Sequence, residues 1–130
     1  MGLSQFDEVQ AQTNYLHLVA ADGLGEVTVA DARPQSVRVD SIYVSNDDAV
    51  DHVLTLLLSK GGAGLPIGSA NIPAGTGVAG APSVDFLAMA LPSGATGLVF
   101  DGGCSLKVNL SVAMGGTSQL CGIAQSGVVG

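Results

Sequence analysis

Residues 37–60 read VRVDSIYVSNDDAVDHVLTLLLSK, and they open with two short runs in which apolar and polar residues alternate. Val37 and Val39 share one face of the first run, and Ile42 and Val44 share one face of the second. The two runs are out of step by one residue near Asp40-Ser41. A slip of this kind predicts a β-bulge within one long strand.

A second strand is predicted after the turn-forming residues Asn46-Asp47-Asp48. Its apolar face carries every other residue, namely Leu54, Leu56 and Leu58. We therefore expect residues 37–60 to form a hairpin whose two apolar faces line one side of a β-sandwich core.

The composition extends this interpretation to the whole chain. Its 130 residues suit a single domain, and 19 Gly and 5 Pro with no Trp favour short strands joined by many turns. The aromatic residues are few, so the core is expected to be aliphatic; they are Phe6, Tyr15, Tyr43, Phe86 and Phe100.

Further strands are expected where apolar residues alternate or β-branched residues gather, at 13–20, 26–29, 67–72, 96–100 and 106–112. Residues 83–91 have the apolar spacing of a short helix, and a strand is the alternative there. Gly115-Gly116 predicts a tight hairpin that sets Cys121 opposite Leu110. The predicted fold class is all-β: a two-sheet antiparallel sandwich of jelly-roll type with at most one short helix.

We expect three parts: an N-terminal arm at 1–12, a β-sandwich domain at 13–126 and a soft C-terminal tail at 127–130. Residues 61–82 are almost entirely Gly, Ala, Pro, Ser, Ile and Val, and they are expected to form an ordered long loop at a subunit contact. Their Gly and Pro residues argue against a membrane-spanning helix, and no secretory signal is visible, so we expect a soluble protein.

Cys104 and Cys121 are expected to be two buried free thiols rather than a disulfide. In the predicted hairpin they lie six residues apart along the strand, roughly 20 Å, whereas bridged Cα atoms lie within about 7 Å. Free thiols suit a reducing compartment.

The formal charge is −7, from 11 carboxylates and four basic residues. Four scattered cations argue against a nucleic-acid binder and against an anionic membrane surface. Of the 15 charged residues 12 lie in residues 1–60, so the later part of the chain is nearly uncharged. Such a surface predicts a subunit that other protein covers in an assembly; the alternative is a monomer with a Ser-, Thr-, Gly- and Asn-rich surface.

No catalytic, cofactor-binding or metal-binding residue is predicted, and no cofactor is expected. Asp47, Asp48 and Asp51 match the letters of a magnesium-diphosphate motif, but that motif requires long facing helices, so a solvated turn is expected. His17 and His52 accompany no nucleophile signature. Tyr15 and Tyr43 are the candidate aromatic platforms for a sugar.

Three phrases are similar to those of small phage virion proteins of the head-decoration, or cement, type. They are Ile42-Tyr43-Val44-Ser45-Asn46, Asn71-Ile72-Pro73-Ala74-Gly75-Thr76-Gly77 and Asp101-Gly102-Gly103-Cys104-Ser105-Leu106-Lys107-Val108. The resemblance implies a non-enzymatic jelly-roll subunit, often a homotrimer, that binds the major capsid protein on the capsid surface after assembly in the host cytoplasm.

Within this hypothesis, loop 61–82 and the tail after Ser126 are expected to make subunit contacts, and the arm at 1–12 is expected to act as a clamp. Two other hypotheses stay open. One is a neck, tail or baseplate subunit, and the other is a carbohydrate-binding sandwich that uses Tyr15 or Tyr43.

Overall fold

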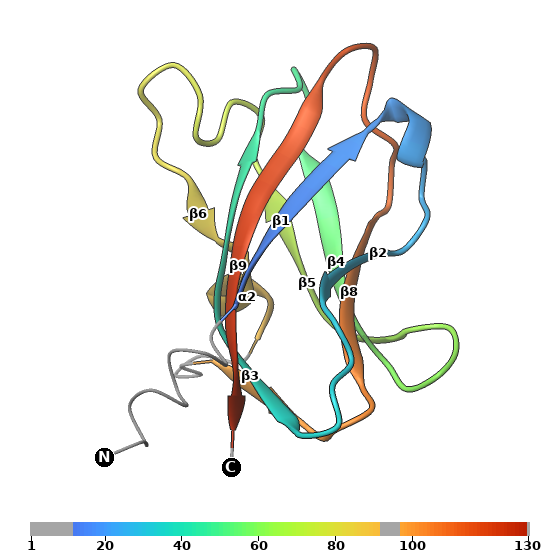
Figure 1. Ribbon diagram of the computed structural model, residues 1–130. Helices are drawn as coiled ribbons and strands as arrows, with labels where there is room; N and C mark the ends of the chain where they lie inside the picture. Colours follow the sequence, from blue (N-terminus) through green and yellow to red (C-terminus); the bar gives the residue numbers. More distant parts are fainter. Residues whose placement is uncertain (1–11, 92–96, 130) are drawn as a thin grey trace.

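The computed structural model describes residues 12–91 and 97–129, which form two antiparallel sheets packed face to face (Figure 1). The first sheet has the order β1-β9-β3-β6, and β7 also pairs with β3. The second sheet has the order β2-β8-β4-β5. The strands of the first sheet are β1 (Gln12–Val19), β3 (Ser36–Asn46), β6 (Val84–Asp85), β7 (Leu98–Phe100) and β9 (Gln119–Val129). Those of the second are β2 (Val27–Ala30), β4 (His52–Ser59), β5 (Leu65–Ile72) and β8 (Ser105–Leu110).

This strand order is that of a jelly roll. The chain changes sheet after β1, β2, β3, β5, β7 and β8, and β4 and β5 pair with each other as a hairpin. Eight-stranded jelly rolls wind two Greek keys in this way. The predicted all-β, two-sheet sandwich is confirmed.

The predicted bulge in β3 is also confirmed. Its pairing with β9 shifts register between Val39 and Ser41. Because the shift compensates for the one-residue slip in the sequence, Val37 and Val39 before it and Ile42 and Val44 after it all face the core and are buried.

The hairpin expected at 37–60 is wrong. Strand β3 lies in the first sheet and β4 in the second, and residues 47–51 carry the chain between them. Ile42 and Leu54 still meet in one core, but from opposite sheets. Alternation shows which face of a strand is buried and leaves the identity of its neighbour open.

The hairpin expected at Gly115-Gly116 is wrong for the same reason. Strand β8 pairs with β2 and β4, whereas β9 pairs with β1 and β3. The two glycines turn the chain locally, with Ser118 N donating to Gly115 O at 2.9 Å, inside a loop that joins the two sheets. Cys104 and Cys121 are free, as predicted; Cys104 is buried and Cys121 is partly buried.

Residues 84–90 contain both a strand and a helix, the two alternatives expected for residues 83–91. Two residues extend the first sheet as β6, and α2 (Phe86–Ala90) follows, with Phe86 and Leu87 buried. A 3-10 turn, η1 (Ala20–Asp22), follows β1. Because β9 runs to Val129, the soft tail predicted at 127–130 is wrong for residues 127–129, which pair with β3. The proposed arm falls on residues 1–11, outside the described residues, and on Gln12 in β1.

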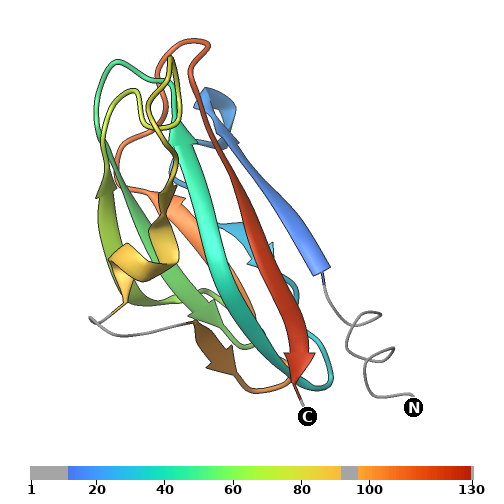
Figure 2. The ribbon, with the colours of Figure 1, turned by 90° about the vertical axis from the view of Figure 1, so that its left-hand side faces the viewer.

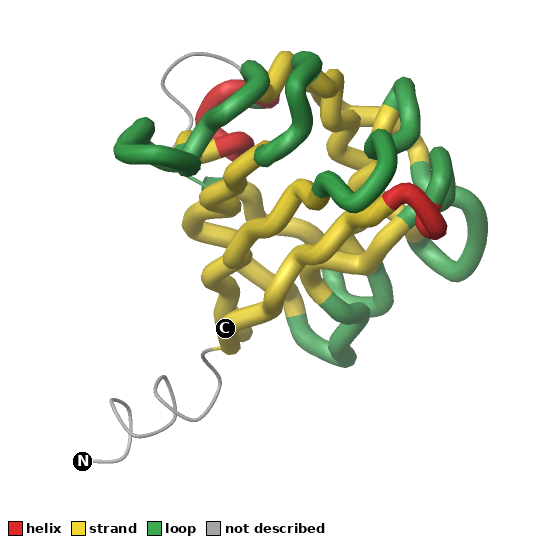
Figure 3. The backbone as a smooth tube through the Cα atoms, turned by 90° about the horizontal axis from the view of Figure 1, so that it is seen from above, coloured by secondary structure: helices red, strands yellow, loops and turns green. Residues whose placement is uncertain are grey.

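The core between the sheets is mainly aliphatic, as predicted, and its aromatic side chains are those of Phe86 and Phe100. Loops 47–51, 73–83 and 111–118 lie together at one end of the sandwich (Figures 2 and 3). Within residues 12–91 and 97–129, neither helix has the length of a membrane span.

Candidate interaction surface

The outer face of the first sheet carries a row of three exposed apolar side chains. Tyr15 on β1 pairs with Ile123 on β9, which pairs in turn with Tyr43 on β3. Their exposed fractions are 79%, 41% and 49%. Neighbouring strands lie about 5 Å apart, so the three side chains form one continuous apolar row.

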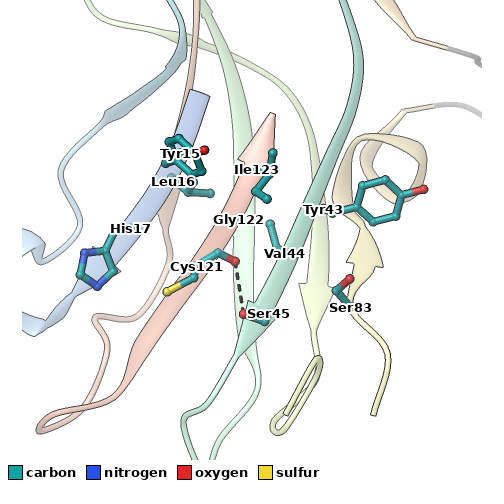
Figure 4. A pocket seen from close by; sticks show the side chains of 10 residues that line it. All are labelled: Tyr15, Leu16, His17, Tyr43, Val44, Ser45, Ser83, Cys121, Gly122 and Ile123. Carbon is teal, nitrogen blue, oxygen red and sulfur yellow. Dashed lines mark hydrogen bonds between the residues drawn. The ribbon is translucent and has the colours of Figure 1, made fainter. Parts of the chain in front are cut away.

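A groove of about 500 Å³ lies beside this row (Figure 4). Tyr15, Ile123 and Tyr43 line it together with the next row toward the loop end, His17, Cys121 and Ser45, and with Ser83. Its size falls within the range of small-ligand sites, roughly 300–1,000 Å³. Hydroxyl, imidazole and thiol groups therefore border an aromatic surface.

Charged side chains are absent from the two strands that form most of this face. Neither the eight residues of β1 nor the eleven of β9 include Lys, Arg, Asp or Glu. The charges on this face lie on β3, where Arg38 Nε contacts Asp40 Oδ1 at 2.8 Å, and the second sheet also has an ion pair on its outer side, Lys107 Nζ to Glu26 Oε1 at 3.7 Å. Protein interfaces are enriched in Tyr and depleted of charge at their centres, and the row of Tyr15, Ile123 and Tyr43 has both properties.

Cys121 in the groove is not an activated nucleophile. Burial raises the pKa of its thiol, and the negative charge of Asp47 raises this pKa further. Gln119 Oε1 accepts hydrogen bonds from His17 Nε2 at 2.5 Å and from the Cys121 thiol at 3.7 Å. Because reactive cysteines need a lowered pKa, this arrangement holds the outer face together and does not supply a nucleophile.

His52 is buried and has both ring nitrogens in hydrogen bonds. Nε2 bonds to Asp48 Oδ2 at 2.8 Å and Nδ1 bonds to Val112 O at 3.0 Å. A catalytic histidine oriented by a carboxylate presents its other nitrogen to a nucleophile, but here a backbone carbonyl occupies that position. The His52–Asp48 pair therefore fastens loop 111–118 to the start of β4.

The three aspartates of the 47–51 loop each hold a different segment. Asp47 Oδ1 accepts from Gln119 N at 2.6 Å, Asp48 Oδ2 accepts from Gly115 N at 3.1 Å, and Asp51 Oδ1 accepts from Ala74 N at 2.9 Å. Among the described residues, no three His, Cys, Asp or Glu side chains gather as a metal site. The three aspartates therefore hold together the loops at this end of the sandwich.

These bonds predict how stability depends on pH. Bonds from His52 and from Gly115 N–H hold the pKa of Asp48 below its ordinary value of 3.8, and those from Ala74 N–H and the Asn71 amide do the same for Asp51. A carboxyl with a lowered pKa in the folded state stabilises the fold above its unfolded pKa, and this stabilisation is lost as the pH falls through the folded pKa. We expect the free energy of unfolding to fall below about pH 4, and to fall less steeply in Asp48→Asn.

Urea unfolding at about pH 6 and about pH 3 checks this prediction. Asp31→Asn is the matched control, because Asp31 is exposed and its side chain makes no hydrogen bond within the described residues. An unchanged pH slope in Asp48→Asn would contradict the role of Asp48.

No family model and no curated protein matches the sequence. Two solved structures of a pentameric capsid protein from metagenomic phage sequences are 12% and 14% identical to this chain, with TM-scores of 0.49 and 0.45. Each match covers 93% of this chain, and 69% and 61% of the other. The cyanophage Pam1 capsid asymmetric unit is 16% identical, with a TM-score of 0.45, over 93% of this chain and 84% of that one.

Tyr15 and Tyr43, the two tyrosines that the sequence singled out, are 28 residues apart in the chain, and both line the groove. The sequence interpretation missed Ile123, which lies between them. The alternation of residues 120–126 could have indicated Ile123 as an exposed residue. It was overlooked because the sequence interpretation paired this strand with the preceding one, whereas β9 pairs with β1 and β3. Eight residues of the expected loop 61–82 form β5, and Gly77 in its later part lies against Ser45 of the groove, where an added Cβ would be 2.6 Å from the Ser45 Cβ.

Proposed function

We propose that this chain is a non-enzymatic virion structural protein, a capsid decoration or cement protein that binds the head shell of a phage. The observation that carries the proposal is the outer face of the first sheet, where Tyr15, Ile123 and Tyr43 are exposed. Tyr15 and Ile123 lie on β1 and β9, two strands that contain no charged residue, and Tyr43 lies on β3. A surface of this kind is suited to burial against another protein.

Attachment of a cement protein depends on buried area and on repetition. An interface of standard size buries roughly 1,600 Å² in total, and each shell presents many equivalent sites. Linked copies bind more tightly than one copy, because the second contact is intramolecular. The three phrases that resemble those of cement proteins lie on β3, from the end of β5 into the loop after it, and from the turn before β8 into that strand, and this resemblance supports the same proposal.

In this proposal the chain forms a homo-oligomer, with a trimer as the expected state, and its partner is the major capsid protein. Residues 1–11 act as a clamp. Residues 61–64 and 73–82 contribute subunit contacts, because they carry no charge and several of them are exposed on loops. The tail is omitted from these contacts, since residues 127–129 belong to β9.

The experiment that tests the proposal adds purified, labelled chain to shells of the phage that encodes it, after these shells have been stripped of it. Electron cryomicroscopy then locates the added protein. We expect density repeated over the shell lattice. A single ring at one vertex would favour the neck, tail or baseplate hypothesis, and no binding to any part of the virion would overturn the proposal.

Deletion of residues 1–11 is expected to weaken attachment to the shell while the sandwich stays folded. Strand β1 begins at Gln12, so the deletion removes no residue of the described sheets. Shell occupancy by co-sedimentation and the urea midpoint check the two parts of this prediction. Full occupancy of the shell by the shortened chain would remove the clamp from the account.

Carbohydrate binding is the second candidate, and the groove is the observation that favours it. Two tyrosines border a mainly apolar, uncharged hollow that Ser45 and Ser83 also line, and sugars stack on aromatic faces and bond to hydroxyl groups. A glycan array distinguishes the candidates. A specific signal that is lost in Tyr43→Ala would support a sugar site, whereas an empty array together with shell binding would leave the first proposal in place.

A further inference from the structure

Within residues 12–91 and 97–129, strand β1 is an edge of the first sheet that no other strand covers. It pairs with β9 on one side, and all eight of its residues do so in an unbroken register. Proteins usually shield such edges with charge, proline, a bulge or a short strand, because free backbone groups invite pairing with another chain. The sequence of β1, QTNYLHLV, has no charged residue and no proline, and its register has no bulge.

The other described edges are shielded. Strand β5 contains Pro66, and α2 covers its Gly68, where an added Cβ would lie 2.3 Å from Ala90 O. Strand β2 has four residues and a register shift, β6 has two residues, and β7, which pairs with β3, has three. The contrast identifies β1 as the edge that is available for pairing (Figure 2).

Side-chain hydrogen bonds show which backbone groups of β1 are free. Val19 N donates to Asp22 Oδ2 at 2.8 Å, so this N–H points away from β9. Alternate N–H groups of a strand point to the same side, so those of Thr13, Tyr15 and His17 also point to the free edge.

The other side of the sheet gives the same result independently. Ile42 N donates to Asp85 Oδ1 at 3.1 Å, away from β9, so Tyr43 N–H points toward β9. Tyr43 and Ile123 are therefore a hydrogen-bonded pair, and the next pair across, Ile123 and Tyr15, is a non-hydrogen-bonded pair. The free groups of Tyr15 again point outward.

We propose that two copies of this chain pair antiparallel through β1, about a two-fold axis at Tyr15. In this register Tyr15 lies opposite Tyr15 of the second copy, and Thr13 lies opposite His17. Each of these pairs exchanges both N–H···O bonds, so every free group of the three residues finds a partner. The inner and outer faces stay continuous across the junction, and no like charges meet.

The occupant is a second copy because the edge is self-complementary. The same three residues supply donors and acceptors that match themselves after a two-fold rotation, and the two tyrosines meet on the outer face as an aromatic pair. The inference goes beyond the proposed function and does not depend on it. Within a trimeric decoration protein, a two-fold contact joins one trimer to the next.

The experiment measures amide exchange by NMR and molar mass by light scattering over a range of chain concentrations. We expect the mass to rise from one chain to two, or from three to six. The amides of Thr13, Tyr15 and His17 are expected to exchange about tenfold more slowly once nine chains in ten are paired, whereas those of Asn14, Leu16 and Leu18 stay protected at every concentration.

Tyr15→Lys is expected to abolish this association, because two like charges would meet at the axis. Gln125→Lys is the matched control: it adds the same charge to the same face, one strand inward, opposite Thr13, and is expected to associate like the wild type. A constant mass, or association that survives Tyr15→Lys, overturns the inference. Protection of the three amides that does not change with concentration also overturns it, since the chain would then cover its own edge.

Discussion

Replacing Asn46 with alanine is expected to lower the free energy of unfolding by about 3–4 kcal/mol. The Asn46 side chain is fully buried at the end of β3. Its Nδ2 donates to Val50 O at 3.1 Å and to Ile72 O at 3.2 Å, and its Oδ1 accepts from Asp48 N at 3.0 Å. Alanine would leave these backbone groups without partners, and each unsatisfied buried group costs about 1–3 kcal/mol.

The backbone of Asn46 also makes hydrogen bonds, so the loss of its side chain is expected to affect two loops. Asn46 N donates to Thr76 O and Gly75 N donates to Asn46 O, each at 2.9 Å, so one residue connects loops 47–51 and 73–83. Asn109→Ala on β8 is the control, because Asn109 is half-buried on the outer side of the second sheet and its side chain makes no hydrogen bond within the described residues. Urea unfolding should separate the two variants; equal losses would contradict the role of Asn46.

Ile123→Lys is expected to weaken shell binding at least about 30-fold, which corresponds to about 2 kcal/mol. Ile123 is the centre of the row, flanked by Tyr15 on β1 and Tyr43 on β3. A lysine there would bring an unpaired ammonium into an interface to which neither β1 nor β9 contributes an acidic side chain. Burying a charge without a partner is costly, so the effect falls mainly on dissociation.

The matched control is Thr55→Lys, on the outer face of the second sheet. Thr55 is half-exposed and lies in the centre of β4, so the variant adds the same charge to the same kind of position on the opposite face. Binding is measured by titrating shells with each purified variant, after circular dichroism has shown that both are folded. Equal weakening by the two variants would argue against a surface located on the first sheet.

Much of the fold follows from the sequence because strand alternation is a local property. The slip at Asp40-Ser41 predicted the bulge, and Leu54 and Leu56 predicted a buried face of β4. The pairing of strands is a long-range property that alternation does not encode. Both hairpins inferred from turn residues failed, because in a jelly roll a turn between consecutive strands usually changes sheet.

The candidate surface was predictable only in part. Tyr15 and Tyr43 stood out because the chain has few aromatic residues, but their meeting depends on β9 lying between β1 and β3. Ile123 lies between the two tyrosines on the outer face because β9 occupies this position. The charge pattern pointed to the later part of the chain, and the structure shows that β9 from that part shares its uncharged face with β1.

The most direct test of the central claim is a reconstruction, at side-chain resolution, of the phage shell with this protein bound. We predict that the outer face of β1, β9 and β3 lies against the shell, with the exposed fraction of Ile123 falling from 41% to near zero. A shell contact made by the outer face of the second sheet, with Tyr15, Ile123 and Tyr43 left open to solvent, would contradict the account.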